Sequence, residues 1–374
     1  MKIALLSSAH KHDDDRLFHH FAKTLAQKGH LITIISSECD FKTEGEISIS
    51  SFNGLNFNRK QKIKIYIDKL SQFNPDAIIC LEPLPILAAK KYAKGKNTKI
   101  IYDITEWYPS KNQLEKYHYL LRLFYAIPYF IAFLYSCSLA DGFIYGEYYK
   151  GLIPKKIFSK KKNIHISYYP KKEYIIETEP NITHNLLRLS YSGTISKEKG
   201  FIYFLNVLKE LIKNNENLTI QVKIIGRFNP KEKKEYFNLI GQFNEKVSFS
   251  VYDFQELSKF IELINDTDIF LDLRTLDFIN SHCLPIKLFY FIALKRPIIY
   301  SDLKAIKKEI ATENFGHLVN PKNYKNIAHL IQNYQENEKL YLTHCVNARN
   351  SFETKYNWTT IETKFTDFIE SFKS

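Results

Sequence analysis

Short apolar runs alternate with amphipathic segments along the first part of the chain. The apolar runs are rich in β-branched side chains, which is typical of strands buried on both faces of a sheet. They occupy residues 2–8, 30–36, 76–82 and 99–105. Between the first two runs, residues 13–29 combine acidic residues at the start, one apolar helical face and Gly29 as a stop. Further helices are predicted near residues 60–73 and 86–93. The alternation predicts an α/β fold with a doubly wound parallel sheet.

The same pattern restarts after a loop at residues 170–183. The predicted strands of this second series lie at residues 187–193, 219–226, 246–252 and 268–273. Neither half contains a G-x-G-x-x-G fingerprint, which disfavours a dinucleotide-binding dehydrogenase. We expect two Rossmann-like domains, residues 1–180 and 181–354, that face a central cleft. Residues 355–374 carry one apolar helical face, and we expect this helix to pack back on the first domain.

Composition narrows the class of partner. The 374 residues carry a net charge of +13 together with 28 Phe and 25 Tyr, which suits nucleic acid, anionic lipid or a phosphorylated small molecule. Nucleic acid is the weakest of these, because the lysines are spread along the chain without a recognised binding motif. The five cysteines form no C-x-x-C pair, and the apolar run at the N-terminus is too short for a signal peptide. We therefore expect a cytoplasmic protein with reduced thiols.

Residues 120–139 form a run of about 20 residues with Arg122 as the single charge, which approaches the length of a membrane span. Pro128 and two serines within the run disfavour a spanning helix. One alternative is a buried pair of helices. The other is a helix lying on an anionic membrane surface, with Lys111 and Lys116 among the basic residues facing lipid headgroups.

Three predicted strand ends in the second half carry chemistry suited to phosphate, because ligands of open α/β sheets bind outside the carboxyl ends of the strands. Gly193 and Thr194 end the first strand and precede Lys199. Gly226 and Arg227 end the second. The third segment, residues 282–290, leads through a proline to Lys287 at the start of a helix. The alternatives are a turn with a solvated lysine pair for the first segment, a surface arginine for the second, and a core helix started by proline, with a solvated lysine, for the third.

The first half offers a different set of groups after its strands. His10, Asp14 and Arg16 lie at or just after the end of the first strand. An aspartate beside a histidine can act as a base toward an acceptor hydroxyl, and Arg16 can hold an acceptor phosphate. The alternative is that the aspartates cap a helix. Asp103 and Glu106 form a second candidate pair. Asp266-Thr267-Asp268 mimics a metal-binding D-x-D, but it precedes a buried strand and is interpreted as a cap, so no metal site is expected.

Five segments resemble family 4 glycosyltransferases of the GT-B fold, of the capsule, O-antigen and lipopolysaccharide type. LPIKLFYFIALKRPIIYSD resembles their donor-binding segment, and YSGTISKEKG resembles the phosphate-contacting loop of their second domain. AHKHDDDRLFHHFAKTLAQKGHLITII, IYDITEWYP and YNWTTIETKFTDFI resemble their first strand and helix, their Asp-x-His-Glu segment and their closing helix. The segments occur in the family's order and cover most of the chain.

The resemblance implies transfer of a sugar from a nucleotide donor, UDP-linked by expectation, to a saccharide or polyprenyl-diphosphate-linked acceptor in surface glycan synthesis. It implies no obligatory metal or other cofactor, a retaining course, and a position at the inner face of the cell membrane. The first domain holds the acceptor, with His10, Asp14, Asp103 and Glu106 as catalytic candidates and Arg16 as an acceptor contact. The residues expected to bind the donor are Gly193, Thr194, Lys199, Arg227, Tyr252, His282, Leu284, Pro285, Ile286, Lys287 and Tyr290.

Departures from the family pattern leave two alternatives open. The family's paired glutamates fall on His282 and Tyr290, the arginine after the loop glycine is Thr194, and the histidine of the Asp-x-His-Glu segment is Thr105. A non-catalytic sugar-nucleotide-binding subunit is therefore one alternative, and a nucleotide-sugar epimerase of the same fold is another. Phosphate clamps matter more than a carboxylate nucleophile if the leaving phosphate stabilises a loose transition state.

Overall fold

The computed structural model describes residues 1–115, 117–176, 178–243 and 245–373, without the side chains of residues 111 and 112. The chain divides into two compact units: an N-terminal unit of Met1–Tyr168 with Ile361–Ser374, and a C-terminal unit of Tyr169–Thr360. The first division precedes the expected boundary at residue 180, because the Tyr169 ring packs on Phe289 and Tyr356 and the Pro170 carbonyl accepts from the Trp358 N–H, all in the C-terminal unit.

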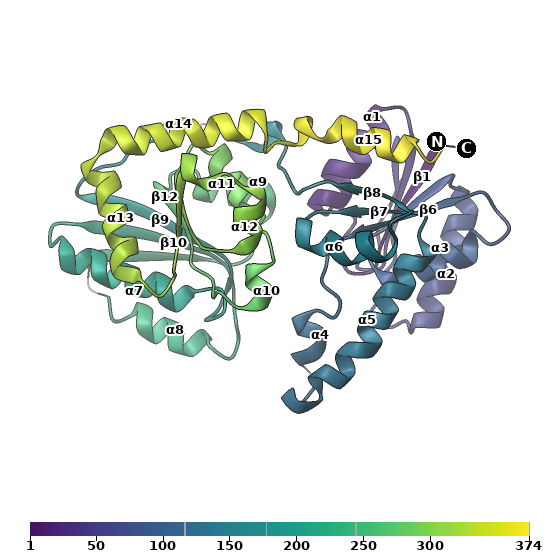
Figure 1. The fold of residues 1–374 in the computed structure, drawn as a ribbon, viewed down its shortest axis with the longest axis horizontal. Coiled ribbons are helices and arrows are strands. Elements are labelled where there is room, and N and C mark those ends of the chain that lie inside the picture. The colour runs from purple at the N-terminus through teal and green to yellow at the C-terminus, as the bar shows by residue number, and fades with distance from the viewer. Residues whose placement is uncertain (116, 177, 244, 374) are drawn as a thin grey trace. The chain divides into compact units, whose positions relative to one another are not determined.

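The N-terminal unit is built on an eight-stranded sheet in the order β3-β4-β2-β1-β5-β6-β7-β8 (Figure 1). Every pairing is parallel except that of β3 with β4. The strands are β1 (Lys2–Ser7), β2 (Leu31–Ser36), β3 (Lys42–Thr43), β4 (Ile47–Ser50), β5 (Ala77–Cys80), β6 (Lys99–Ile104), β7 (Gly142–Tyr145) and β8 (Lys162–His165). The chain first adds strands outward from β1 through β2 to β3 and β4, and then crosses back past β1 to β5. The order in which strands are added therefore reverses between β1 and β5.

Helices cover this sheet on both faces, as the buried apolar strands require. They are a π-helix η1 (Asp15–Ala22), α1 (Lys23–Gln27), α2 (Arg59–Phe73), α3 (Pro83–Tyr92), α4 (Lys111–Glu115), the short 3₁₀ turn η2 (Tyr119–Leu121), α5 (Arg122–Leu139), α6 (Tyr148–Ile157) and α15 (Glu362–Glu370). The last of these belongs to the N-terminal unit, where Phe365 stacks on Phe21 at 4.3 Å between ring centroids and Glu370 contacts His30 at 3.1 Å. The pattern of the sequence did not predict β3, β4, β7 or β8.

The C-terminal unit has a six-stranded, fully parallel sheet in the order β11-β10-β9-β12-β13-β14. Its strands are β9 (Leu186–Ile195), β10 (Thr219–Phe228), β11 (Val247–Tyr252), β12 (Ile269–Asp272), β13 (Ile298–Ser301) and β14 (Gly316–Val319). Its helices are η3 (Lys172–Tyr174), α7 (Phe201–Asn214), α8 (Lys233–Ile240), α9 (Leu257–Ile264), α10 (Phe278–Ser281), α11 (Lys287–Ala293), α12 (Lys304–Glu309), η4 (Thr312–Asn314), α13 (Tyr324–Glu336), α14 (Glu338–Thr354) and η5 (Trp358–Thr360). The order in which the chain adds strands to this sheet reverses between β9 and β12. The predicted pair of doubly wound parallel sheets is confirmed.

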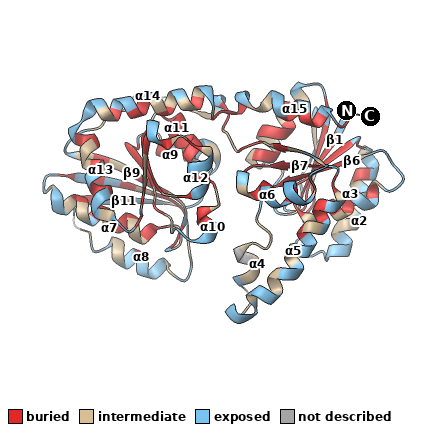
Figure 2. Ribbon diagram, viewed as in Figure 1, coloured by how far each residue is buried: buried red, intermediate tan, exposed pale blue. Residues whose placement is uncertain are grey.

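The expectation of a buried helix pair at residues 120–139 is wrong. This segment is one helix, α5, preceded by η2, and Pro128 lies inside it, where a proline removes a single ladder hydrogen bond. Tyr119–Leu139 is long and apolar enough to cross a membrane, yet only 17% of its most apolar window is buried. Phe133 and Cys137 pack against the sheet, while the first half of α5 extends away from it and is largely exposed (Figures 1 and 2). Lys116 and the side chain of Lys111 lie outside the described residues.

Candidate functional site

Candidate residues of the N-terminal unit gather at the carboxyl ends of β1 and β5, where the order in which the chain adds strands reverses. Such reversal points are where open α/β sheets bind ligands. His10 follows β1 and remains partly accessible, with 29% of its side chain exposed. Its Nδ1 lies 3.0 Å from Asp14 Oδ2, while Asp14 Oδ1 accepts from the Arg16 and Leu17 backbone N–H groups. Asp14 therefore caps the helix and also orients the imidazole.

Carboxylates surround His10. The hydrogen bond with Asp14, aided by the negative charges of Asp14, Glu82 and Glu106, raises the pKa of His10 to about 9. Burial raises the pKa of Asp14, but the hydrogen bond and charge of His10 outweigh it, so that the net change is downward. The pair thus favours the charged imidazolium, which stabilises a proton taken up by the ring.

Glu82 is a site residue that the sequence reasoning missed. It follows β5, is 5% exposed, and accepts hydrogen bonds from the Ser7 hydroxyl and from the Ser8 backbone N–H at 2.8 and 2.7 Å. Its Oε1 lies 3.7 Å from His10 Nε2. The available signal was an acidic residue directly after a buried apolar strand. This residue has an ordinary local explanation, because it also precedes the helix that begins at Pro83.

Arg16 and Asp103 lie together, but they pair with each other. The Arg16 guanidinium donates to both carboxylate oxygens of Asp103 at 2.6 and 2.8 Å and to the Ile166 carbonyl at 3.0 Å. Both side chains are almost completely buried, and the guanidinium lies over the rings of Phe21 and Tyr168. With all three nitrogens donating within the protein and only 6% of its side chain exposed, Arg16 is placed as a structural residue, and the geometry does not support an acceptor contact.

Glu106 keeps an exposed side chain in the loop after β6, close enough to act on the charge of His10. This loop is held by Lys150 on α6, whose Nζ donates to the Thr105 carbonyl at 2.5 Å. Lys150 is itself paired with Glu147 at 2.6 Å, and both side chains are buried. Of the two candidates after β6, Glu106 is therefore the accessible one and Asp103 is not.

In the C-terminal unit the carboxyl ends of β9 and β10 approach each other through two glycines. Gly226 has φ +141°, and a Cβ there would lie 1.9 Å from the Gly193 carbonyl oxygen. Gly193 has φ +115°, and a Cβ there would lie 2.9 Å from Lys287 Nζ. The Lys287 ammonium thus lies directly over the bare backbone of Gly193, and burial lowers its pKa to about 8.

Further basic groups surround this point where β9 and β12 diverge. Burial and the positive charge of Arg274 lower the pKa of Lys199, whose Nζ donates to the fully buried Asn280 at 2.8 Å. Arg274 follows β12 and pairs with Asp272, with Nε 2.8 Å from Oδ1. Asp272 and Arg274 both act on the charge of Lys287. We call Lys199, Arg274 and Lys287 the basic cluster; Arg274 was not anticipated from the sequence.

Other expected donor contacts lie at the periphery or in the core. Arg227 is exposed, 5.4 Å from the ring centroid of Phe254, and Tyr252 ends the adjacent β11. Thr194 and Ile286 are exposed, while Leu284, Pro285 and Tyr290 are buried. His282 Nδ1 lies 2.7 Å from the Phe278 carbonyl oxygen. The position of the family's second glutamate, Tyr290, is thus part of the core.

Asp266 and Asp268 form ion pairs and do not cap a helix. Asp268 binds the Arg188 guanidinium at 2.8 Å and Asp266 binds Lys223 at 2.7 Å. Among the described residues, no group of three or more His, Cys, Asp or Glu side chains is arranged to hold a metal ion. None of the five cysteines, all of which the structure describes, forms a disulfide bond.

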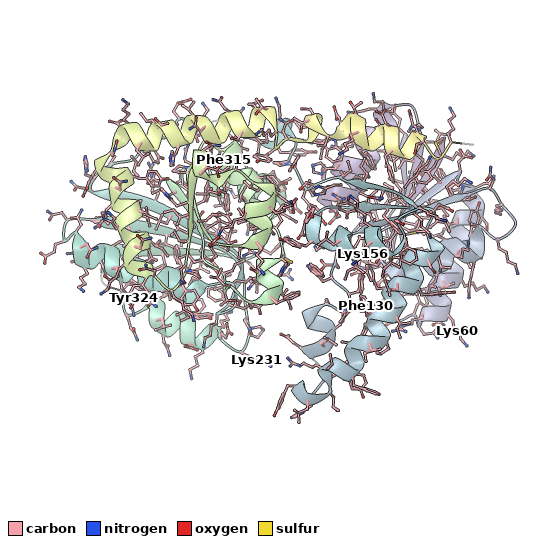
Figure 3. All side chains as sticks on the ribbon, viewed as in Figure 1. Lys60, Phe130, Lys156, Lys231, Phe315 and Tyr324 are labelled. Atoms are coloured by element: carbon pink, nitrogen blue, oxygen red, sulfur yellow. The ribbon has the colours of Figure 1, made fainter. Side chains whose placement is uncertain are left out.

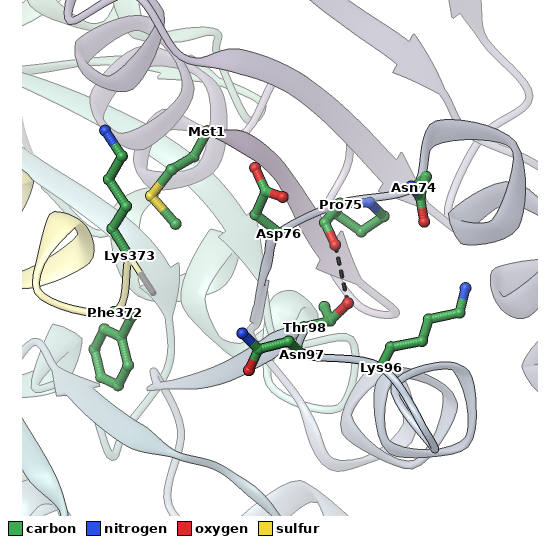
Figure 4. A pocket seen from close by; sticks show the side chains of 9 residues that line it. All are labelled: Met1, Asn74, Pro75, Asp76, Lys96, Asn97, Thr98, Phe372 and Lys373. Atoms are coloured by element: carbon green, nitrogen blue, oxygen red, sulfur yellow. Dashed lines mark hydrogen bonds between the residues drawn. The ribbon is translucent and has the colours of Figure 1, made fainter.

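A separate cavity of about 580 Å³ lies at the opposite, amino-terminal edge of the first sheet (Figure 4). Its walls come from the residues before β5 and β6 and from the end of the chain, and the Thr98 hydroxyl donates to the Pro75 carbonyl at 3.0 Å beside it. It contains none of the predicted site residues.

Comparisons with known proteins agree with this arrangement. Residues 175–351, which lie in the C-terminal unit, match the model of the family described as Glycosyl transferases group 1. Sucrose-phosphate synthase from Thermosynechococcus elongatus is similar in structure, with TM-score 0.74, 13% identity and coverage of 99% of this chain and 98% of that one. Anabaena Alr3699/HepE in complex with UDP is similar with TM-score 0.67, 13% identity and coverage of 99% and 100%. An E. coli trehalose-6-phosphate structure bound with UDP-2-fluoro glucose has TM-score 0.69, 10% identity and coverage of 98% and 99%. No curated protein sequence matches this chain. At these identities the likeness shows the fold, which is GT-B.

Proposed function

We propose that this protein transfers a sugar from a nucleotide-sugar donor, with UDP as the nucleotide, to a hydroxyl group of a saccharide or of a polyprenyl-diphosphate-linked saccharide. The observation that carries the proposal is the basic cluster around the bare backbone of Gly193, at the reversal point of the sheet in the unit that matches the glycosyltransferase group 1 family. A lysine ammonium over a glycine, with Arg274 close enough to act on the charges of both Lys199 and Lys287, suits a diphosphate, which needs both close backbone approach and compensation of charge. The UDP complexes of proteins that share the fold support this choice of nucleotide.

In this proposal the C-terminal unit binds the donor and the N-terminal unit binds the acceptor. The acceptor oxygen attacks the anomeric carbon of the sugar, and the bond from that carbon to the diphosphate oxygen breaks. The proton of the acceptor hydroxyl passes to His10 Nε2, since Nδ1 is occupied by Asp14. The nucleoside diphosphate leaves with the bonding electrons, and the basic cluster compensates its charge. The residues invoked require neither a metal nor another cofactor.

The resemblance to family 4 implies retention at the anomeric carbon, whereas an oriented histidine base favours inversion. Retention without a carboxylate nucleophile uses the leaving phosphate as the base, and His10 has no part in it. Inversion places the acceptor opposite the leaving group, so that a protein base is needed. The site holds such a base and has no glutamate at residues 282 and 290, and we therefore propose inversion. The anomeric coupling constant of the product, measured by proton NMR, decides between the two courses.

We also propose that the protein lies at the cytoplasmic face of the bacterial membrane during surface glycan synthesis. Exposed apolar side chains line η2 and the adjoining part of α5: Leu120, Leu121, Leu123, Phe124, Ile127 and Ile131. Arg122 lies among them, and α6 of the same unit ends in Lys155 and Lys156; Figure 3 labels Lys156 on α6 and Phe130 on α5. Apolar residues beside cations match a surface of anionic lipid.

A donor screen with matched variants tests the proposal. Wild-type protein is incubated with UDP-, GDP-, dTDP- and CMP-sugars, and binding is read as a rise in melting temperature. We expect UDP-sugars to raise it, Lys287→Met to abolish the rise, and Lys325→Met, an exposed lysine on α13, to leave it unchanged. Transfer is then measured with saccharide acceptors. Donor binding without release of UDP in the presence of any acceptor supports the non-catalytic subunit. Conversion of the free UDP-sugar without acceptor supports the epimerase.

A further inference from the structure

We propose that Glu82 is a positioning residue for His10: its carboxylate anchors the turn that carries His10 and places a negative charge beside the Nε2 edge of the ring. The inference rests on the proposed function, in which Nε2 receives the proton of the acceptor. Neither the family resemblance nor the spacing of residues in the sequence points to Glu82.

The anchoring runs through Ser7. Its hydroxyl oxygen accepts from the backbone N–H groups of Ala9 and His10 at 3.2 and 2.9 Å, and its single proton is donated to Glu82 Oε1 at 2.8 Å. The other carboxylate oxygen, Oε2, accepts from the Ser8 backbone N–H at 2.7 Å and from the Ser8 hydroxyl at 3.3 Å. The turn after β1 is therefore fixed to a buried carboxylate that follows the neighbouring strand β5, and His10 is fixed with it.

The ring of His10 is held at Nδ1, and 29% of the His10 side chain is exposed. Asp14 occupies Nδ1, and the Ser36 hydroxyl donates to the His10 carbonyl at 2.5 Å, so backbone and ring are both oriented. The separation of 3.7 Å between Nε2 and Glu82 is too long for a hydrogen bond but short for two opposite charges. Nε2 can therefore reach a substrate hydroxyl while the Glu82 carboxylate stabilises the proton that Nε2 takes up.

The charged groups that face His10 in the described residues are Asp14, Glu82 and Glu106, and all three raise its pKa. Glu82 in turn faces the phenols of Tyr66, Tyr102 and Tyr108 and the thiol of Cys80, all with raised pKa and neutral near pH 7. Burial raises the pKa of Glu82, opposed by the two serines and His10. A base with a pKa of about 9 must lose its proton before each turnover, so kcat/KM for the acceptor, measured at saturating donor, rises with pH and levels off near pH 9.

The pH profile of kcat/KM is measured for wild type and for Glu82→Gln, Glu82→Asp and Ser8→Ala. We expect Glu82→Gln to move the rising limb about one pH unit lower, because an opposite charge near the ring is lost. Glu82→Asp keeps the charge and loses reach, so the limb stays and kcat falls. Ser8→Ala removes a hydrogen bond and no charge, and leaves the limb in place. An identical limb in Glu82→Gln and wild type overturns the proposal, since a merely structural role does not move it.

A measurement independent of activity separates this inference from the proposed function. The ring of His10 is titrated by NMR in histidine-labelled protein, with its signal assigned by its loss in His10→Gln. We expect a raised pKa in wild type and a lower one in Glu82→Gln. A wild-type value near the ordinary 6.5 contradicts the inference even if Glu82→Gln does not fold. A shifted titration in a protein that transfers no sugar leaves the role of Glu82 in place and removes the proposed function; transfer with no shift does the reverse.

Discussion

The buried ion pair of Arg16 and Asp103 gives a sharp test of whether these residues are structural or catalytic. In Asp103→Asn the side chain keeps its shape and loses its charge, so the Arg16 guanidinium stays buried without a counter-charge. Arg16 cannot turn toward solvent, because it is held between the rings of Phe21 and Tyr168 and donates to the Ile166 carbonyl. We expect the N-terminal unit to be destabilised.

The magnitude follows from the burial of both partners, whose side chains are 6% and 0% exposed. Removing one partner of a buried pair costs about 3–5 kcal/mol. For a domain of this size each 1 kcal/mol lowers Tm by about 2–4 °C, so we expect a fall of about 10 °C. The double variant Arg16→Met with Asp103→Leu removes both charges, and we expect it to recover much of the loss.

The assay uses the two tryptophans, since Trp107 lies in the N-terminal unit and Trp358 in the C-terminal unit. Urea unfolding is followed by fluorescence in a Trp358→Phe background, which reports the N-terminal unit. Asp68→Asn, an exposed carboxylate on α2, is the matched control and should leave the midpoint unchanged. An unchanged midpoint in Asp103→Asn, together with loss of transfer, would show that Asp103 is catalytic and that the structural interpretation is wrong.

Three further predictions concern other parts of the chain. Gly226→Ala places a Cβ 1.9 Å from a backbone oxygen at φ +141°, and we expect a loss of at least about 3 kcal/mol in the C-terminal unit by urea unfolding, with Gly241→Ala as control. The folded-state pKa of Lys287, about 8, lies below its ordinary 10.5, so its buried charge is a cost below pH 8 that disappears as the pH rises to 10.5. Stability of the ligand-free protein should therefore rise over that range in wild type and lose this rise in Lys287→Met, while calorimetry should show UDP affinity falling above pH 8. Replacing Leu123, Phe124 and Ile127 with serine removes about 1 kcal/mol each, so binding to phosphatidylglycerol vesicles should weaken roughly 100-fold, while Leu342→Ser on α14 has no effect. Unchanged vesicle binding in the triple variant would exclude α5 as the membrane contact.

Sequence reasoning located the strand ends that carry the candidate chemistry, because polar residues after buried apolar runs mark the carboxyl edge of a parallel sheet. It could not rank those residues. His10 and Arg16 are six positions apart and looked equally available, yet one keeps an accessible ring edge and the other is buried against Asp103. It also missed Glu82 and Arg274, since an acid before a proline-started helix and an arginine after a short strand have ordinary local explanations.

The sequence by itself determined the fold class, since the alternation of buried β-branched runs with amphipathic segments is a local pattern that is legible without partners. It also determined that Gly193, Lys199 and Lys287 lie after strands at the carboxyl edge of the second predicted sheet, because the motifs keep the family's order. Only the tertiary structure decided which side chains are free. The chain crosses back past β1 to β5, and this crossing places Glu82 beside His10, although the two residues are far apart in the sequence. The packing of η1 on the sheet pairs Arg16 with Asp103. Likewise, the apolar run at residues 120–139 is consistent with either a core or a surface position. Only the tertiary structure shows that most side chains in the first half of this run are not buried.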